Sequence, residues 1–372
     1  MLKVDLQHAK LKEGTVSEEI HDKVWTPDEW NAWLELPNVM DTNEIKKTAK
    51  EVRGKCDVLA VIGIGGSYLG ALAGLQMLGG DFPIEFLGTS FDPTPVHRFL
   101  EKYKGKRIAI NVISKSGNTL EISSVFEILK SYASEIIITT DANKGYFRDM
   151  VNREGYKAFI VPDGVGGRYS VLSAVGLLPL AVAGINIDKI LDGAQKAYKD
   201  LQKKDNEAYK YAIARNDLHK CKSVEVLASF YEGFDAFGRW WQQLFGESEG
   251  KESKGIFPVF MVYSRELHSM GQYIQEGSPI FFETMINIVN PPTDLNGLNR
   301  LNDAAFKGTL KAHAANAPVV VLHLDKLDEA SFGYLVFFMK VACATSAYIL
   351  GVNPFDQPGV ELYKKEMREI LK

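Results

Sequence analysis

Short apolar runs without alternating polar residues recur along most of this chain, and amphipathic helical patterns separate them. A strand that is buried on both faces needs apolar side chains throughout, whereas a strand with one wet face alternates. The first block contains expected strands at 58–63, 83–87, 107–113, 135–140 and 156–161, with helical patterns between them at 68–78, 94–103 and 120–132. This order of elements predicts a parallel sheet covered by helices on both faces.

The same organisation returns in the second half of the chain. A long apolar helix is expected at 170–184 and a polar helical stretch at 187–216, and strands follow at 224–229, 256–263, 280–289 and 318–323. Further helices are expected at 236–245, 268–275 and 335–350. A chain of 372 residues with 46% apolar residues can bury two such cores. We therefore predict the α/β class, with two doubly wound parallel-sheet αβα sandwich domains and extra N- and C-terminal helices.

The expected domain boundaries lie where polar helical stretches give way to short apolar runs that alternate with helical patterns, or the reverse. Residues 1–50 form an N-terminal helical segment, with helical periodicity at 24–36 and 43–52. The first domain covers 51–185, connecting helices cover 186–220, the second domain covers 221–352, and a turn and a helix at 353–372 end the chain. Because no low-complexity or proline-rich linker separates the domains, we expect them to pack together.

Charge and cysteine usage narrow the class of protein. The net charge is -4 and no block of lysine and arginine stands out, which disfavours nucleic acid and anionic membranes as partners. No stretch approaches the length of a membrane span, and the first twelve residues are too charged for a signal peptide. Cys56, Cys221 and Cys343 match neither a disulfide framework nor a zinc pattern. We expect a soluble cytoplasmic protein without a metal site.

Two loops between a strand and a helix carry hydroxyls and glycines. In the first, Ser114-Lys-Ser-Gly-Asn-Thr119, the hydroxyls, a lysine and the free N–H groups of a helix start suit a phosphate. The alternative is an over-polar helix cap, for which a single Ser or Thr would suffice. In the second, Gly65 and Gly66 let backbone N–H groups approach an anion, and Ser67 opens the helix.

Neither nucleotide motif fits this glycine loop. The dinucleotide fingerprint needs a small residue where Tyr68 stands, and no Gly-Lys-Ser/Thr follows as in a Walker loop. Two serine-bearing loops on neighbouring strands therefore favour a sugar phosphate.

Candidates for acid, base and cation lie at other element ends. Arg168 stands beside a helix start, where it can stabilise an oxyanion or clamp a phosphate, and a salt bridge with Asp163 is an equally good interpretation. Glu247 closes an aromatic helix and is either a solvated end residue or a base. His268 begins a helix, where a cap is the ordinary role, and Lys364 lies on a basic helix whose simplest interpretation is a solvated face.

These clusters occur together in one known family. With "GIGGSYLGA", "GGRYSVLSAVGLLPLAVAGI", "GVNPFDQPGVELYKK" and "ESEGK" followed by "LHSMGQYIQEG", the chain resembles the glucose-6-phosphate isomerase family, in its short bacterial branch, from about residue 50 onward. The resemblance implies two sugar-isomerase (SIS) domains in a cytoplasmic homodimer with no metal or organic cofactor. It also implies interconversion of glucose 6-phosphate and fructose 6-phosphate through a cis-enediol(ate), in glycolysis and gluconeogenesis.

The resemblance also assigns roles to residues. Glu247 matches the base that moves the proton between C1 and C2, and Arg168 matches the cation beside the enediolate. His268 matches a histidine that assists ring opening from the partner subunit, and Lys364 matches the lysine near the ring oxygen. The matched substrate-binding positions are Ser67, Ser114, Lys115, Ser116 and Thr119 for the phosphate and Gln243 and Gln357 for the sugar, beside Gly65 and Gly66.

Alternatives remain beside this interpretation. Glu249 is the nearest rival for the base, although a helix end should point it to another side than Glu247. A dual phosphoglucose/phosphomannose isomerase would differ only in pocket shape around C2. A non-catalytic sugar-phosphate sensor needs the loops but not the catalytic residues. The chain also departs from the family, because it is short, it lacks an acidic insert at 290–305, and Tyr68 replaces a small or acidic residue.

Overall fold

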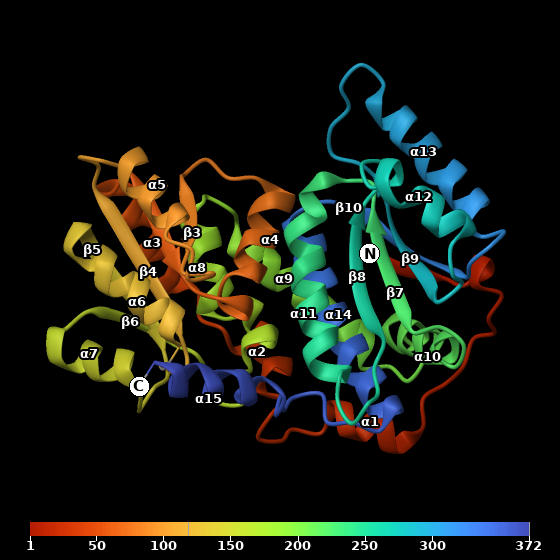
Figure 1. Cartoon of the computed structure of the whole chain (residues 1–372), viewed down its shortest axis with the longest axis horizontal. Coiled ribbons are helices and arrows are strands. Elements are labelled where there is room, and N and C mark those ends of the chain that lie inside the picture. Colours follow the sequence, from red (N-terminus) through yellow and green to blue (C-terminus); the bar gives the residue numbers. More distant parts are fainter. Residues whose placement is uncertain (118, 372) are drawn as a thin grey trace.

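Two five-stranded sheets organise the protein in the computed structural model, which describes residues 1–117 and 119–371. The first sheet has the order β3-β2-β4-β5-β6, and all of its strands are parallel. Its strands are β2 (Val58–Ile62), β3 (Ile84–Leu87), β4 (Ile108–Ser114), β5 (Ala133–Thr140) and β6 (Lys157–Ile160). The two sheets lie side by side in two lobes (Figure 1).

The second sheet has the order β1-β10-β9-β7-β8. Its parallel strands, taken as β8-β7-β9-β10, follow the same chain order as β3-β2-β4-β5 in the first sheet. The strand β1 (Leu2–Asp5) pairs antiparallel with β10 at the edge. Its parallel strands are β7 (Val224–Ser229), β8 (Phe257–Val262), β9 (Phe281–Asn290) and β10 (Val319–Lys326). The predicted fold class is confirmed, and every expected strand is present. The apolar runs form parallel strands because both of their faces are covered, as in β4, where all residues are buried.

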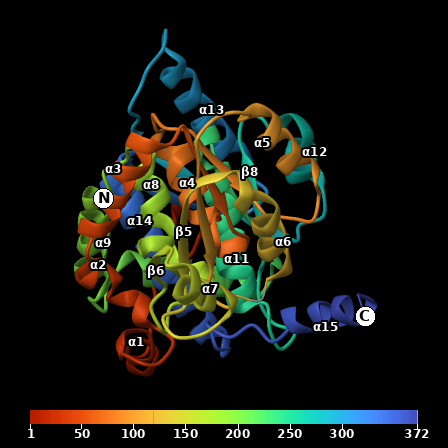
Figure 2. The ribbon, with the colours of Figure 1, turned by 90° about the vertical axis from the view of Figure 1, so that its left-hand side faces the viewer.

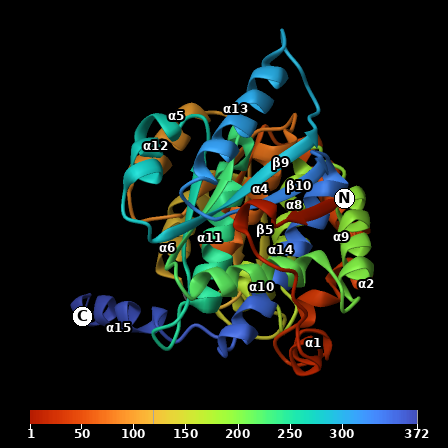
Figure 3. The ribbon, with the colours of Figure 1, turned by 90° about the vertical axis from the view of Figure 1, so that its right-hand side faces the viewer.

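Helices cover both sheets. In the first lobe they are α3 (Asn43–Lys55), α4 (Leu69–Leu78), α5 (Thr94–Lys102), α6 (Leu120–Leu129), α7 (Tyr146–Glu154) and α8 (Ala174–Val182). The second lobe has α9 (Ile187–Leu201), α10 (Glu207–His219), α11 (Asp235–Glu249), α12 (Leu267–Glu276), α13 (Leu298–His313) and α14 (Glu329–Leu350). The helix α15 (Val360–Ile370) returns to the first lobe, and both α13 and α15 project from the body (Figures 1, 2 and 3).

The two lobes share one continuous core, as expected from the missing linker. Leu69 of α4, Val171 before α8, Trp240 of α11 and Phe337 of α14 belong to the same buried cluster. The helices α9 and α10, which were expected to connect the domains, both pack against α14. The domain boundaries at 186 and 220 stay predictions.

Several element predictions are wrong at the N-terminal end. The helix expected at 24–36 is instead α1 (Glu18–Trp25), a 3-10 turn at 32–34 and α2 (Leu36–Val39). The carboxylate of Asp28 accepts hydrogen bonds from the N–H groups of Trp30 at 2.7 Å and Asn31 at 2.9 Å, which closes a turn in place of a helix. β1 is a strand within the N-terminal segment that was expected to be helical, and α7 and α13 lie in stretches where no element was expected.

The long apolar helix expected at 170–184 is divided. A 3-10 segment, Gly167–Leu172, precedes α8, and the side chain of Ser173 caps α8 by accepting a hydrogen bond from the N–H of Val175. The helix α14 is longer than predicted, with 22 residues, so the prediction that no stretch reaches the length of a membrane span is wrong. However, 83% of the apolar 18-residue stretch of α14 is buried inside the protein, which identifies α14 as a core helix.

Candidate active site

A cavity of about 360 Å³ opens at the carboxyl edge of the first sheet, where the strand order reverses between β2 and β4. Open parallel sheets bind ligands at such a point. The loops after β2 and β4, the end of α11 and the helix α15 form its wall. The predicted site residues that line it are Gly65, Ser116, Thr119, Gln243, Glu247, Gln357 and Lys364.

The glycine loop after β2 brings two distant segments together. Gly65 has a φ of +56°, and a Cβ on it would lie 2.8 Å from the side-chain nitrogen of Gln243. A Cβ on Gly66 would lie 2.2 Å from the carbonyl carbon of Gly167. The glycines were predicted for close approach to an anion. That prediction stays open, and Gly66 has a packing role besides, since only glycine lets this loop touch the backbone before Arg168.

Only some side chains of the hydroxyl loop after β4 line the cavity. Ser116 and Thr119 line the cavity, and the side chain of Thr119 makes no cap bond to α6. Ser114 is buried, and its Oγ accepts a hydrogen bond from the N–H of Gly117 at 3.2 Å. The Lys115 ammonium points elsewhere and donates to the carbonyls of Pro162 and Val165 at 3.1 and 3.2 Å. The alternative of a simple polar helix cap therefore loses support.

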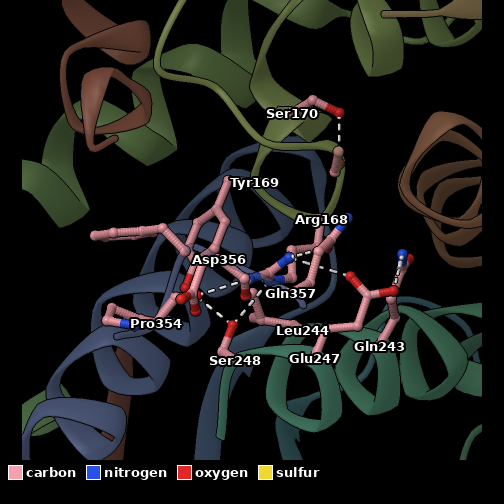
Figure 4. Close-up of polar contacts among 12 residues, drawn as sticks. Arg168, Tyr169, Ser170, Gln243, Leu244, Glu247, Ser248, Pro354, Asp356 and Gln357 are labelled. Carbon is pink, nitrogen blue, oxygen red and sulfur yellow. Dashed lines mark hydrogen bonds and ion pairs between the residues drawn. The ribbon is translucent and has the colours of Figure 1, made fainter. Parts of the chain in front are cut away.

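Arg168 is 2% exposed and all of its guanidinium nitrogens donate hydrogen bonds (Figure 4). Nη1 donates to Glu247 Oε2 at 3.1 Å and to Gln357 Oε1 at 2.6 Å. The remaining bonds go to Ser248 Oγ at 2.9 Å and to the carbonyls of Pro354 at 2.8 Å and Asp356 at 3.3 Å. Its ion pair is thus with Glu247, not with Asp163.

Glu247 lies in the last turn of α11 with its side chain 29% exposed, so that it reaches both the cavity and a buried cation. Its Oε2 accepts from Arg168, and its Oε1 accepts from Gln243 Nε2 at 3.1 Å. These two donors fix the carboxylate plane. The other amide atom of Gln243, Oε1, is buried and has no hydrogen-bond partner among the described residues.

The rival carboxylate, Glu249, faces away from the cavity. It is fully buried and pairs with Arg215 through contacts of 2.5 and 3.1 Å. Arg215 also donates to Glu225 Oε2 at 2.6 Å. Both oxygens of Glu249 are therefore occupied by one guanidinium, as a structural ion pair requires. The expectation that the helix end separates Glu247 from Glu249 is confirmed.

Two predicted catalytic residues lie on projecting elements. Lys364 lines the cavity from α15, and its ammonium donates to Glu361 Oε1 at 2.9 Å. His268 is exposed at the start of α12 and does not line the cavity. Gly66, Ser67, Ser114, Lys115 and the buried Arg168 are likewise not part of the cavity wall.

Some cavity residues were not predicted. Glu121, Tyr363 and Arg368 line it, and Ser248 holds the guanidinium of Arg168. A signal existed for Arg368, because it stands four residues after Lys364 and so shares its face of a helix. Among the residues that the structure describes, no group of three or more His, Cys, Asp or Glu side chains could hold a metal ion.

The arrangement suits proton transfer next to an oxyanion. A carboxylate faces the cavity with a guanidinium at 3.1 Å, and the hydroxyls of Ser116 and Thr119 and the start of α6 line the same cavity. A weakly acidic C–H of a bound ligand could lose its proton to the carboxylate while the cation stabilises the charge that remains. The hydroxyls and the N–H groups at the helix start would hold an anionic tail.

Comparison with known proteins bears on this chemistry. A family model described as phosphoglucose isomerase matches residues 37–277. A glucose-6-phosphate isomerase of Clostridium tetani is 46% identical over 399 residues, covering 95% of this chain and 89% of that protein. A solved hypothetical protein from Thermus thermophilus matches with a TM-score of 0.86 and 29% identity, over 95% of this chain and 94% of that one. A solved glucose-6-phosphate isomerase from Chlamydia trachomatis shares the fold, with a TM-score of 0.80 and 21% identity over 96% and 80%.

Proposed function

Because the chain belongs to the phosphoglucose isomerase family and interconverts glucose 6-phosphate and fructose 6-phosphate, we propose that this reaction takes place in the cavity beside Glu247. The reaction is a step of glycolysis and, in reverse, of gluconeogenesis. The observation that carries the location is the ion pair between the buried Arg168 and Glu247, whose carboxylate lines the same cavity as Thr119 and Lys364.

In the proposed mechanism Glu247 moves one proton between C1 and C2 of the open-chain sugar. Its carboxylate takes the proton from one carbon, the electron pair of that C–H bond forms the C=C bond of a cis-enediol(ate), and the proton returns to the other carbon. Gln243 and Arg168 hold both oxygens of Glu247, which keeps the base aligned with the two carbons.

Arg168 stabilises the negative charge wherever it resides. In the resting site the charge is on Glu247, 3.1 Å from the guanidinium. Once Glu247 takes up the proton, it is neutral and the charge lies on the enediolate oxygen. A buried cation beside Glu247 would lower the energy of the intermediate, and loss of one such donor costs about 3–4 kcal/mol in a typical site.

The phosphate is proposed to lie at the start of α6. Ser116 and Thr119 line this end of the cavity, and the first N–H groups of α6 supply partial positive charge. Ser67, Ser114, Gly65 and Gly66 would complete the phosphate site. Since carbonyls hold the Lys115 ammonium, Lys115 would contribute through its backbone N–H.

Product analysis in D₂O tests the proposed reaction. The protein should convert fructose 6-phosphate into glucose 6-phosphate, and a fraction of the product should carry deuterium at C2, because the proton on Glu247 exchanges with solvent. ¹H NMR of the product measures both. Absence of glucose 6-phosphate would contradict the function, and a product always free of deuterium would contradict exchange of the transferred proton with solvent.

Ring opening is proposed to need His268 of a second copy, in a homodimer. The supporting observations are that His268 is exposed, away from the cavity wall of its own chain, and that apolar side chains such as Leu298, Leu301 and Leu362 are more than half exposed on the projecting helices. A homodimer would cover such surfaces and complete each site with a residue from the other protomer.

Subunit complementation tests the shared site. Mixed dimers of Glu247→Gln and His268→Asn chains contain one site with both residues intact, so refolding the two inactive variants together should restore activity. Each variant refolded alone is the control. If the mixture stays as inactive as its components, His268 does not act across the interface.

Residence in the cytoplasm stays a prediction. It is supported by Cys56, Cys221 and Cys343, which are all free thiols, as is typical of proteins in a reducing compartment. Recovery of the activity from the exterior of intact cells would contradict it.

A further inference from the structure

Lys251 joins the end of α11 to the segment that precedes α15. Its side chain is only 9% exposed, and its ammonium donates to Asp356 Oδ1 at 2.5 Å and to the carbonyl of Asn353. Burial lowers the pKa of Lys251 although Asp356 acts in the opposite direction. A charged group is thus held in a poorly solvated place by contacts to residues far along the chain.

The helix α15 needs such an anchor because it has none of its own. None of its residues, Val360–Ile370, is buried, and it projects from the body in Figures 2 and 3. Its position over the cavity therefore depends on the residues before it. In that segment Val352 is buried and the ring of Phe355 packs edge-on against Tyr169 at 5.4 Å.

Two cations hold this segment from the side of the active site. Arg168 binds the carbonyls of Pro354 and Asp356 and the side chain of Gln357, and Lys251 binds Asn353 and the carboxylate of Asp356 (Figure 4 shows the Arg168 contacts). Lys251 stands four residues after Glu247, just beyond the last turn of α11. The base and the segment that bears Gln357 and Lys364 are therefore attached to the same helix end.

We propose that Lys251 is a positioning residue that, together with Arg168, fixes the segment 353–357 and thereby sets Gln357 and Lys364 against Glu247 across the cavity. The inference rests on the proposed function of that cavity. Lys251 does not line the cavity and so acts through the segment that it holds. A displacement of about 1 Å in such a group can lower turnover about 10²-fold.

The test compares Lys251→Met with the wild-type enzyme. We expect kcat to fall by roughly 10- to 100-fold, while the inhibition constant of inorganic phosphate stays unchanged, because the phosphate end lies on the first lobe. Trypsin should also cut at Lys364, Lys365 and Arg368 faster, since α15 is less firmly held. Lys251→Arg, which keeps the charge, should recover much of the turnover.

Two further variants test whether the loss of kcat comes from the contact between Lys251 and Asp356. Lys254→Met is the matched control, because Lys254 is exposed and its ammonium contacts Glu252 at 3.3 Å and the carbonyl of Gly351 at 3.5 Å, neither of which belongs to the segment 353–357; its kcat should equal that of wild type. Asp356→Asn keeps the backbone carbonyl that Arg168 binds, and its effect should not add to that of Lys251→Met.

Three results would overturn the proposal: wild-type kcat and tryptic rate in Lys251→Met, an equal loss in Lys254→Met, or a phosphate inhibition constant that rises with the loss of kcat, which would indicate a general structural defect. If the wild-type protein itself fails to isomerise the sugar phosphates, the proposed function fails. The tryptic rates still decide in that case whether Lys251 anchors α15.

Discussion

Glu247→Gln is expected to lower kcat for fructose 6-phosphate by about 10²–10⁴-fold, the usual contribution of a positioned general base. Glutamine has the same shape as glutamate but cannot take up the proton from carbon. Its amide oxygen can still accept from Arg168. Its NH₂ group would face Gln243, whose Oε1 has no partner among the described residues and can accept after a flip of that amide. The cavity should therefore keep its form, and sugar-phosphate binding should change little.

Calorimetric titration with fructose 6-phosphate measures the binding, and exchange of the C1 proton followed by NMR measures the chemistry. Glu252→Gln is the control, because this carboxylate lies just beyond the same helix with its side chain 67% exposed. Normal turnover in Glu247→Gln would exclude Glu247 as the base. Loss of turnover together with loss of binding would instead indicate that the carboxylate serves to hold Arg168.

Lys340→Met is expected to stabilise the protein by several kcal/mol at neutral and lower pH. Lys340 lies in the middle of α14, is fully buried, and its ammonium has no hydrogen-bond partner among the described residues. The ammonium lies over the ring face of Trp33, 5.9 Å from its centre. Burial lowers the pKa of Lys340 from 10.5 to about 7, which corresponds to roughly 5 kcal/mol at about 1.4 kcal/mol for each pKa unit.

The pH dependence of this effect has a definite sign. Below pH 7 the lysine is charged in the folded and the unfolded protein, and its burial destabilises the fold in full. Between pH 7 and 10.5 the unfolded chain binds the proton and the folded chain does not, so wild-type stability rises with pH. Above pH 10.5 both states are neutral and this destabilisation is gone. Methionine fills a similar volume without a charge and removes the dependence.

Urea unfolding of the two proteins at pH 6.5 and pH 9.5 measures the difference. The advantage of Lys340→Met should shrink by roughly 3 kcal/mol over this interval, as the pKa change requires. Lys311→Met, at an exposed position of α13, should show no such trend. An advantage that is equal at both pH values would mean that Lys340 keeps its ordinary pKa in the folded protein, as it would if water solvated its ammonium.

The sequence by itself determined the elements and the general place of the site. Short unbroken apolar runs separated by helical patterns favour buried strands, so the parallel strands were predicted within a few residues, although β1 was not. Because parallel strands end at one edge, the loops after β2 and β4 had to meet there, as Gly65, Ser116 and Thr119 do. The family motifs added Glu247, Gln357 and Lys364 to the same cavity.

Only the tertiary structure decided where side chains point and what they touch. Three contacts join residues that are far apart in the chain: the hydrogen bond of Lys115 to Pro162, the ion pair of Glu249 with Arg215, and the ion pair of Lys251 with Asp356. Such contacts depend on how distant segments pack, whereas periodicity and capping depend on neighbours within a turn or two. For the same reason the sequence around Lys340 predicts only an ordinary lysine on a helix. The packing of α14 inside the protein leaves the Lys340 ammonium without a hydrogen-bond partner among the described residues.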